Sequence, residues 1–117
     1  MEPFQDMVFV AERICGICSF IHGVGFSQGV EKIMNLEVPK RAEVLRVFWG
    51  ELSRVHSHLL WLGLAADAIG FESLFMHVWR VRESVLKIFE ETTGGRVIFS
   101  ACQVGGMRKD IDNDTLK

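Results

Sequence analysis

The sequence predicts a mainly α-helical fold, a helical-bundle-like body with a short extended segment near the C-terminus. Two long stretches repeat apolar residues every three or four positions, and a third helical stretch follows a cysteine motif near the start. Glycines mark the ends of the long stretches. At 117 residues the chain is long enough for one small core, so we expect residues 1–117 to form a single region.

The first part of the chain predicts one short element and one helix. Residues 8–11 are apolar and rich in β-branched valine, which is typical of a strand or of a buried lead-in segment. We expect a helix over residues 19–35, although Gly23, Gly25 and Gly29 each cost it up to roughly 1 kcal/mol relative to alanine. A helix with this many glycines usually gains close backbone approach to a neighbour.

Two longer helices are expected next. Pro39 suits a first helical turn, and the apolar spacing predicts a helix from there to about Ile69, ended by Gly70. A third helix is expected over residues 72–93. The expected core positions of the two helices are Ala42, Leu45, Phe48, Trp49, Leu52, Val55, Leu59, Leu62, Ala66, Leu74, Phe75, Val78, Trp79, Val81, Val85, Leu86 and Phe89.

The last part of the chain predicts no further helix. Gly94 and Gly95 stop the third helix, residues 96–101 are expected to be extended, and Gly105-Gly106 is expected to form a turn. The polar segment 109–117 ends no visible element, and we therefore expect the chain to be part of a longer protein.

Composition excludes several classes of function. The net charge is −2 with a sequence pI near 6.1, so no basic field exists to hold nucleic acid. No apolar run reaches the ~18 residues of a membrane-spanning helix. Three cysteines, an odd number that includes one C-x-x-C pair, argue against a secreted disulfide framework and favour the cytoplasm.

Residues 12–23 carry the most informative pattern, E-R-I-C-G-I-C-S-F-I-H-G. The spacing of Cys15 and Cys18 lets both sulfurs converge on one atom, and Arg13 is placed to favour their thiolate forms. His22 follows Cys18 by one helical turn, within hydrogen-bonding reach of its sulfur. We expect the pKa of Cys18 in particular to be lowered, because it precedes a helix N-terminus.

The spacing alone favours a metal site over a redox dithiol or inert cysteines. Thiolates select zinc, copper(I), nickel or iron–sulfur centres. A metal needs about four ligands, so this pair provides half a site. The residues considered for its completion are Cys102, His22, His56, His58 and His77.

Other polar residues have simpler interpretations. His56 and His58 point to different sides of a helix and are interpreted as solvated or capped structural histidines. Asp67 is interpreted as structural and would need a hydrogen-bond partner if buried. Arg80, Arg82 and Glu83 fit a solvated helix face or a partner-protein surface equally well.

Several stretches of the sequence resemble those of a known family. Residues 12–22 look like the first cysteine motif of the large, catalytic subunit of [NiFe] hydrogenases. Later stretches resemble the membrane-associated, energy-converting branch, which is similar to the quinone-site subunit of respiratory complex I. These stretches are V-E-K-I (30–33), V-P-K-R-A-E (38–43), R-V-H-S-H-L-L (54–60), I-G-F (69–71), L-F-M (74–76) and G-G-M-R-K-D (105–110).

The resemblance implies a nickel–iron centre, with carbon monoxide and cyanide on the iron, that interconverts H2 with protons and electrons. Cys15 would be a terminal nickel ligand and Cys18 a bridging ligand. His22 would tune the bridging sulfur and Arg13 keeps its family position, so both are candidate catalytic residues. Iron–sulfur clusters of a separate small subunit would carry the electrons.

The family's second motif, D-P-C-x-x-C, is absent from this sequence, and Cys102 matches no family position. We therefore expect an N-terminal fragment that is inactive by itself and self-associates through exposed apolar surface. The whole protein would bind an iron–sulfur small subunit and membrane subunits, on the cytoplasmic face of the cell membrane. The alternatives are a quinone-linked NADH dehydrogenase-type subunit and a non-enzymatic zinc-binding or interaction module.

Overall fold

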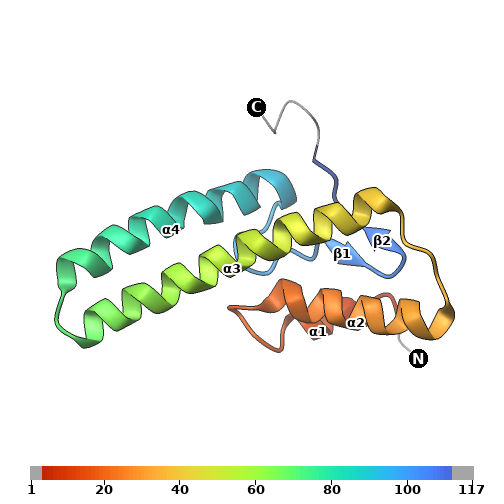
Figure 1. Cartoon of the computed structure of the whole chain (residues 1–117), viewed down its shortest axis with the longest axis horizontal. Coiled ribbons are helices and arrows are strands. Elements are labelled where there is room, and N and C mark those ends of the chain that lie inside the picture. Colours follow the sequence, from red (N-terminus) through yellow and green to blue (C-terminus); the bar gives the residue numbers. More distant parts are fainter. Residues whose placement is uncertain (1–3, 112–117) are drawn as a thin grey trace.

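Helices dominate residues 4–111, which are the residues that the computed structural model describes (Figure 1). Within them, helices α1 and α2 lie on one side of α3, and α4 lies on its other side (Figure 1). A small antiparallel hairpin packs against α2 and α3. The elements are α1 (Met7–Glu12), α2 (Ser19–Met34), α3 (Lys40–Ala68), α4 (Glu72–Thr93), β1 (Cys102–Gln103) and β2 (Gly106–Met107).

The long helices end where the backbone leaves the right-handed region. Asn35 follows α2 in the left-handed conformation, and Gly94 does the same after α4 at φ 84°. Gly70 has φ 79° in the connection between α3 and α4, where a side chain would be strained. The two helices therefore form an antiparallel pair with a short connection (Figure 1).

Aromatic rings join the distant parts of the chain in one core. The ring of Phe99 stacks on both Phe20 and Phe89, with centroid distances of 5.0 and 4.6 Å. Trp49 is fully buried, and its Nε1 donates to Oγ1 of Thr92 at 3.3 Å. The core thus contains side chains from α2, α3, α4 and the segment before β1.

The hairpin is held by one buried ion pair. Cys102 lies opposite Met107 in its two-stranded sheet, and Gln103 lies opposite Gly106. Nη2 of Arg46, on α3, donates to the carbonyls of Gln103 and Gly106 and pairs with Glu31 of α2 at 2.5 Å. Two helices and the hairpin therefore share one buried charge pair.

Most of the predicted elements are confirmed, and the differences are local. Residues 8–11 belong to a helix, so the strand alternative was wrong; the run has only one buried valine, Val8. The strand pairing begins at Cys102 and not within residues 96–101, and Gly106 lies in β2 after the turn. The expected core positions Val55, Leu62, Trp79 and Val81 are exposed by 37–47%.

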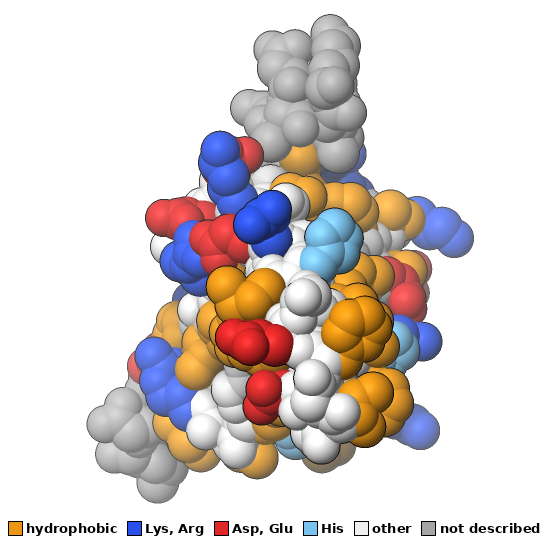
Figure 2. All heavy atoms as spheres, turned by 90° about the vertical axis from the view of Figure 1, so that its left-hand side faces the viewer, with side chains coloured by type: hydrophobic (Ala, Val, Ile, Leu, Met, Phe, Trp, Pro, Cys, Tyr) orange, Lys and Arg blue, Asp and Glu red, His pale blue; other side chains and the backbone are white. Residues whose placement is uncertain are grey.

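The far end of the α3–α4 pair carries many of these exposed apolar side chains. Seen from that end, apolar groups lie among charged ones over the molecular surface (Figure 2). Trp61 is 70% exposed and Ile69 is 79% exposed. No helix within residues 4–111 is long and apolar enough to cross a membrane. Residues 112–117 of the polar segment lie outside the described part.

Candidate metal centre

The candidate centre forms where the chain passes from α1 to α2. Cys15 lies in the loop, Cys18 is the N-cap residue of α2, and His22 lies one turn into that helix, its N–H bonded to the Cys18 carbonyl at 3.4 Å. One ligand atom of each of the three residues lies within 4.8 Å of the other two. All three side chains are half-buried, so the cluster is accessible from outside the chain.

The two thiols differ in proton affinity. The pKa of Cys15 is lowered, first by the thiol of Cys18 donating to its sulfur and then by the backbone N–H groups of Cys18 and Ile17, both at 3.4 Å. The same contact raises the pKa of Cys18, because it holds the proton on the donor. The prediction that the pKa of Cys18 is lowered was therefore wrong. Its side chain makes no capping bond to α2, and the loop amides stabilise the thiolate form of Cys15 instead.

The donor set suits a soft transition metal. Two sulfurs and an imidazole nitrogen are ligands that nickel, iron, zinc and copper accept, whereas magnesium and calcium prefer oxygen. The lowered pKa of Cys15 favours its thiolate form, whereas the raised pKa of Cys18 favours its thiol form, and each sulfur must be deprotonated to become a ligand. With two sulfurs, the cluster meets half of the ligand requirement of a four-thiolate centre.

The side chain of Arg13 bonds to the backbone of α1. Its Nη1 donates to the carbonyl of Phe9 at 2.8 Å, and this bond closes the end of α1. The pKa shifts of Cys15 and Cys18 arise from their mutual contact, the loop amides and burial, with no contribution from Arg13. Its effect on the cluster is thus to fix the turn that leads to Cys15.

The other residues considered as ligands lie elsewhere. Cys102 is fully buried, and its thiol contacts Oγ of Ser27 at 3.5 Å. His56 is buried and faces Arg82, while His58 and His77 are exposed. None joins the cluster of Cys15, Cys18 and His22 within residues 4–111, so none completes the centre.

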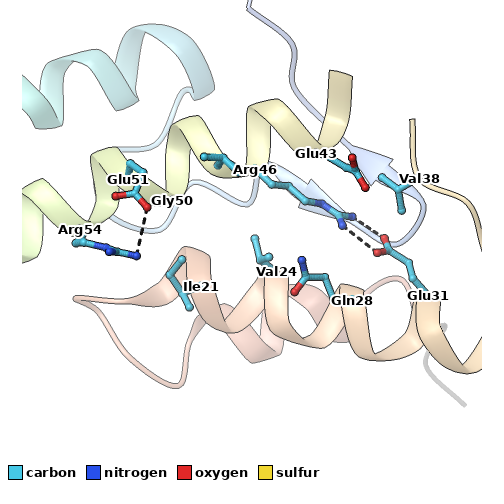
Figure 3. Close-up of a pocket in the computed structure, with 11 residues that line it drawn as sticks. Ile21, Val24, Gln28, Glu31, Val38, Glu43, Arg46, Gly50, Glu51 and Arg54 are labelled. Atoms are coloured by element: carbon cyan, nitrogen blue, oxygen red, sulfur yellow. Dashed lines mark hydrogen bonds and ion pairs between the residues drawn. The ribbon is translucent and has the colours of Figure 1, made fainter. Parts of the chain in front are cut away.

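Helix α3 contributes residues that the sequence pattern did not single out. A pocket of about 170 Å³ lies beside Cys18, and Ser53, Arg54 and Ser57 line it from α3. Arg54 is paired with Glu51 at 3.2 Å on the exposed helix surface (Figure 3). In the sequence, the one feature that indicates a role for Arg54 is its place at the start of the R-V-H-S-H stretch (54–58).

A larger cavity of about 490 Å³ continues along the same groove between α2 and α3. Ile21, Gly50 and Arg54 line both spaces, so the groove runs from Cys18 toward the far end of α2. Arg46 and Glu31 face each other across it, and Gln28 and Glu43 lie nearby (Figure 3). The candidate centre thus opens onto a groove with apolar and charged walls.

Comparisons with known proteins agree with this geometry. The family model described as nickel-dependent hydrogenase matches residues 2–66, and the model described as respiratory-chain NADH dehydrogenase, 49 kDa subunit, matches residues 68–117. Membrane-bound hydrogenase subunit alpha of Pyrococcus furiosus is 44% identical over 92% of this chain and 25% of its own length. Formate hydrogenlyase subunit 5 of Escherichia coli is 41% identical over 97% of this chain and 20% of its own.

A solved structure shows the same fold. One chain in the membrane-bound sulfane sulfur reductase, an archaeal respiratory membrane complex, matches with a TM-score of 0.92 and 29% identity. The match covers 97% of this chain and 30% of that one. The chain therefore spans between 20% and 30% of these three proteins. Because the hydrogenase model matches more than half of its residues, including Cys15, Cys18 and His22, the chain belongs to the nickel-dependent hydrogenase family.

Proposed function

We propose that this chain is part of the large subunit of an energy-converting [NiFe] hydrogenase, whose complete form interconverts H2 with protons and electrons. The observation that carries this proposal is the cluster of Cys15, Cys18 and His22, which lies inside the stretch matched by the hydrogenase model. Residues 1–117 would form one region of a larger domain. By itself the chain would be inactive, because two thiolates are half of the expected set.

The donor set fits a nickel–iron centre with carbon monoxide and cyanide on the iron. Cys15 and Cys18 would hold it, and two further thiolates would come from the rest of the subunit. When bound, the metal pair polarises H2 as a Lewis acid. His22 lies one turn into α2 from Cys18, where it would tune that sulfur by hydrogen bonding. Arg13 would act indirectly, by holding the turn before Cys15.

The partners follow from the same assignment. An iron–sulfur small subunit would carry electrons to or from the centre, and membrane subunits would couple this flow to ion movement. The relatives named for membrane-bound and respiratory complexes support peripheral attachment to a membrane. The cytoplasmic face would be the side of attachment. Nucleic acid is not an expected partner of a chain with a net charge of −2.

A quinone-linked NADH dehydrogenase-type subunit is the second candidate. The match of residues 68–117 to the 49 kDa subunit model favours it. The two candidates differ in what the Cys15–Cys18 pair does, because a quinone site has no need of two thiolates and an imidazole around one point. The cluster therefore ranks the hydrogenase first.

The test is a Cys18→Ser variant in the complete membrane complex. We expect it to abolish H2 turnover and to remove the infrared bands of carbon monoxide and cyanide, because loss of a bridging ligand dismantles the metal pair. His22→Ala should retain these bands and lower turnover by roughly 10–100-fold. His77→Ala, which changes an exposed histidine, is the control and should behave as wild type.

Two outcomes would contradict the proposal. A Cys18→Ser complex that still turns over H2 would exclude Cys18 as a bridging ligand. A wild-type complex that reduces quinone with electrons from NADH, without H2 turnover or infrared bands of carbon monoxide and cyanide, would establish the second candidate.

A further inference from the structure

One short segment, residues 97–100, contacts both ends of the loop that carries the two candidate cysteines. This loop, residues 13–18, runs from Glu12 at the end of α1 to Ser19 at the start of α2. Both flanking residues are buried, with 0% and 1% of their surface exposed. Their contacts with the segment span 88 and 78 positions of the sequence, so the folded core brings them together.

At the exit of the loop, Ser19 is tied to this segment. Its Oγ donates to the carbonyl of Val97 at 2.9 Å. The ring of Phe20, the next residue, stacks on Phe99 with a centroid distance of 5.0 Å. Because Ser19 directly follows Cys18, these two contacts fix the backbone from which the Cys18 side chain extends.

At the entrance of the loop, Glu12 is held on two sides. Oγ of Ser100 donates to its Oε2 at 2.7 Å. On the other side its carboxyl group lies against Gly23, in the second turn of α2, where a Cβ atom would lie 2.9 Å from both Cγ and Oε1 of Glu12. The point at which the chain leaves α1 is therefore fixed relative to α2.

The segment has a closely constrained backbone of its own. A Cβ atom at Gly95 would lie 2.7 Å from the carbonyl oxygen of Ile98 and 2.8 Å from Cα of Phe99, so the chain folds closely back on itself after α4. Ser100 adopts φ 47°, which is uncommon outside glycine. A residue persists in such a conformation where the surrounding contacts hold it. The segment therefore follows one fixed course past the loop.

The loop itself bonds to α1 and within its own backbone. Arg13 donates from its side chain to the carbonyl of Phe9, and the N–H groups of Ile17 and Cys18 point at the sulfur of Cys15. These bonds hold the local shape of the loop. Its position relative to α2 and the core depends on the two residues that flank it.

We propose that residues 97–100 act as a clamp that sets the geometry of the cysteine loop, and that Glu12, Ser19 and Ser100 are positioning residues of the metal centre. Metal ligands must be held near one geometry by the contacts around them. A loop gains that precision when both of its ends are fixed by the same rigid piece of structure. This inference rests on the proposed function, because it takes the two cysteines to be metal ligands.

The main test measures Co²⁺ binding to the complete large subunit in its metal-free form, followed by the absorption of the thiolate–cobalt bonds. Ser19→Ala and Ser100→Ala each remove a hydroxyl group that joins the loop to the clamp. We expect each to weaken Co²⁺ binding by roughly 10–100-fold, as the loss of supporting hydrogen bonds around metal ligands does. Ser27→Ala is the matched control and should retain wild-type affinity, because it removes another buried hydroxyl of α2, one that contacts Cys102.

Conservative variants separate positioning from a purely structural role. Glu12→Gln keeps an oxygen that accepts from Ser100, so it should bind Co²⁺ as the wild type does. Glu12→Ala removes the acceptor and should behave like Ser100→Ala. Urea unfolding of the same subunits provides the comparison, since Ser27→Ala should lower stability without lowering affinity.

A second measurement uses the complete membrane complex. Ser19→Ala and Ser100→Ala should shift or remove the infrared bands of carbon monoxide and cyanide, because a displaced sulfur changes the electron density at the iron. The bands should keep their wild-type positions in Ser27→Ala.

The outcomes separate the clamp from the proposed function. Wild-type Co²⁺ affinity in both Ser19→Ala and Ser100→Ala would overturn the clamp, as would an equal loss of affinity in Ser27→Ala or unshifted infrared bands in both clamp variants. Failure of the proposed function has a different signature, namely a wild-type complex without H2 turnover or infrared bands of carbon monoxide and cyanide.

Discussion

His56 lies inside the α3–α4 pair with 2% of its surface exposed. Nη2 of Arg82 donates to its Nε2 atom at 3.1 Å, so the ring proton of the neutral form resides on Nδ1, which is buried and has no partner in the described residues. Burial and the charge of Arg82 lower the pKa of His56 to about 4. The ring is therefore neutral at physiological pH.

This neutral histidine makes the stability of the fold depend on pH. The unfolded chain binds a proton at His56 below its ordinary pKa of 6.5, whereas the folded chain binds it only near pH 4. The free energy of unfolding should therefore fall by about 3 kcal/mol as pH drops from 6.5 to 4. Urea unfolding of wild type and His56→Gln at pH 7.5 and pH 4.5 checks this, and an identical pH dependence in both would contradict it.

The sequence predicted the members of the candidate centre better than their chemistry. The spacing of Cys15, Cys18 and His22 was sufficient, because one loop and one helical turn bring the three together. Which thiol has the lower pKa depends on the direction of the hydrogen bond between the two thiols and on two backbone N–H groups in the loop, and spacing carries no such information. Arg54 lines the pocket beside Cys18 only through the packing of α3 on α2, which brings distant parts of the chain together.

The buried pair of Glu31 and Arg46 joins the hairpin to the two helices beside it, α2 and α3. Each side chain is 6–7% exposed. Oε1 of Glu31 also accepts from the N–H of Gly105 in the hairpin turn at 2.7 Å. The guanidinium of Arg46 favours the charged form of Glu31 and lowers its pKa, against the opposing effect of burial, which is the larger single influence. The two charges are thus mutually dependent inside the protein.

Replacing one member of the Glu31–Arg46 pair should therefore lower the free energy of unfolding more than replacing both. We expect Glu31→Gln to lower the free energy of unfolding by about 3 kcal/mol, because it leaves Arg46 buried without its counter-charge. Hydrogen exchange at the Gly105 amide should accelerate. Glu31→Leu combined with Arg46→Met should recover part of the loss. A double-mutant cycle by urea unfolding measures both effects, and additive losses would argue against a coupled pair.

Among the elements, periodicity predicted the long helices well and the short segments poorly. Residues 40–68 and 72–93 repeat their apolar positions over many turns, so a local exception such as Val81 does not hide the pattern. Residues 8–11 are too few for a period to decide between strand and helix. The glycines of α2 also differ: Gly23 approaches Glu12 closely, whereas Gly25 and Gly29 have open space around them.

At the scale of the whole molecule, the exposed apolar side chains predict association. Trp61 in the last turns of α3, and Ile69 and Phe71 in the connection to α4, have exposures of 54–79%. The chain spans between 20% and 30% of the three proteins compared above. We expect the isolated chain to self-associate through this end.

Sedimentation of a Trp61→Ser, Ile69→Ser variant tests that expectation. It should shift the isolated chain toward the monomer by at least about 10-fold in dissociation constant, since each apolar side chain buried in a contact contributes about 1.5–3 kcal/mol. Ile33→Ser, which removes an 83% exposed side chain from α2, is the control for lowered surface apolarity. A wild-type chain that remains monomeric at high concentration would contradict the expectation.

In the stack of Phe20, Phe99 and Phe89, a side chain of α2 packs on one that is synthesised much later. A ribosome makes Phe20 long before Phe99, so α2 lacks its central packing partner until most of these residues have left the ribosome. Because the loop with Cys15 and Cys18 leads directly into α2, we expect the native geometry of the two cysteines to be complete only after Phe99 has joined the core.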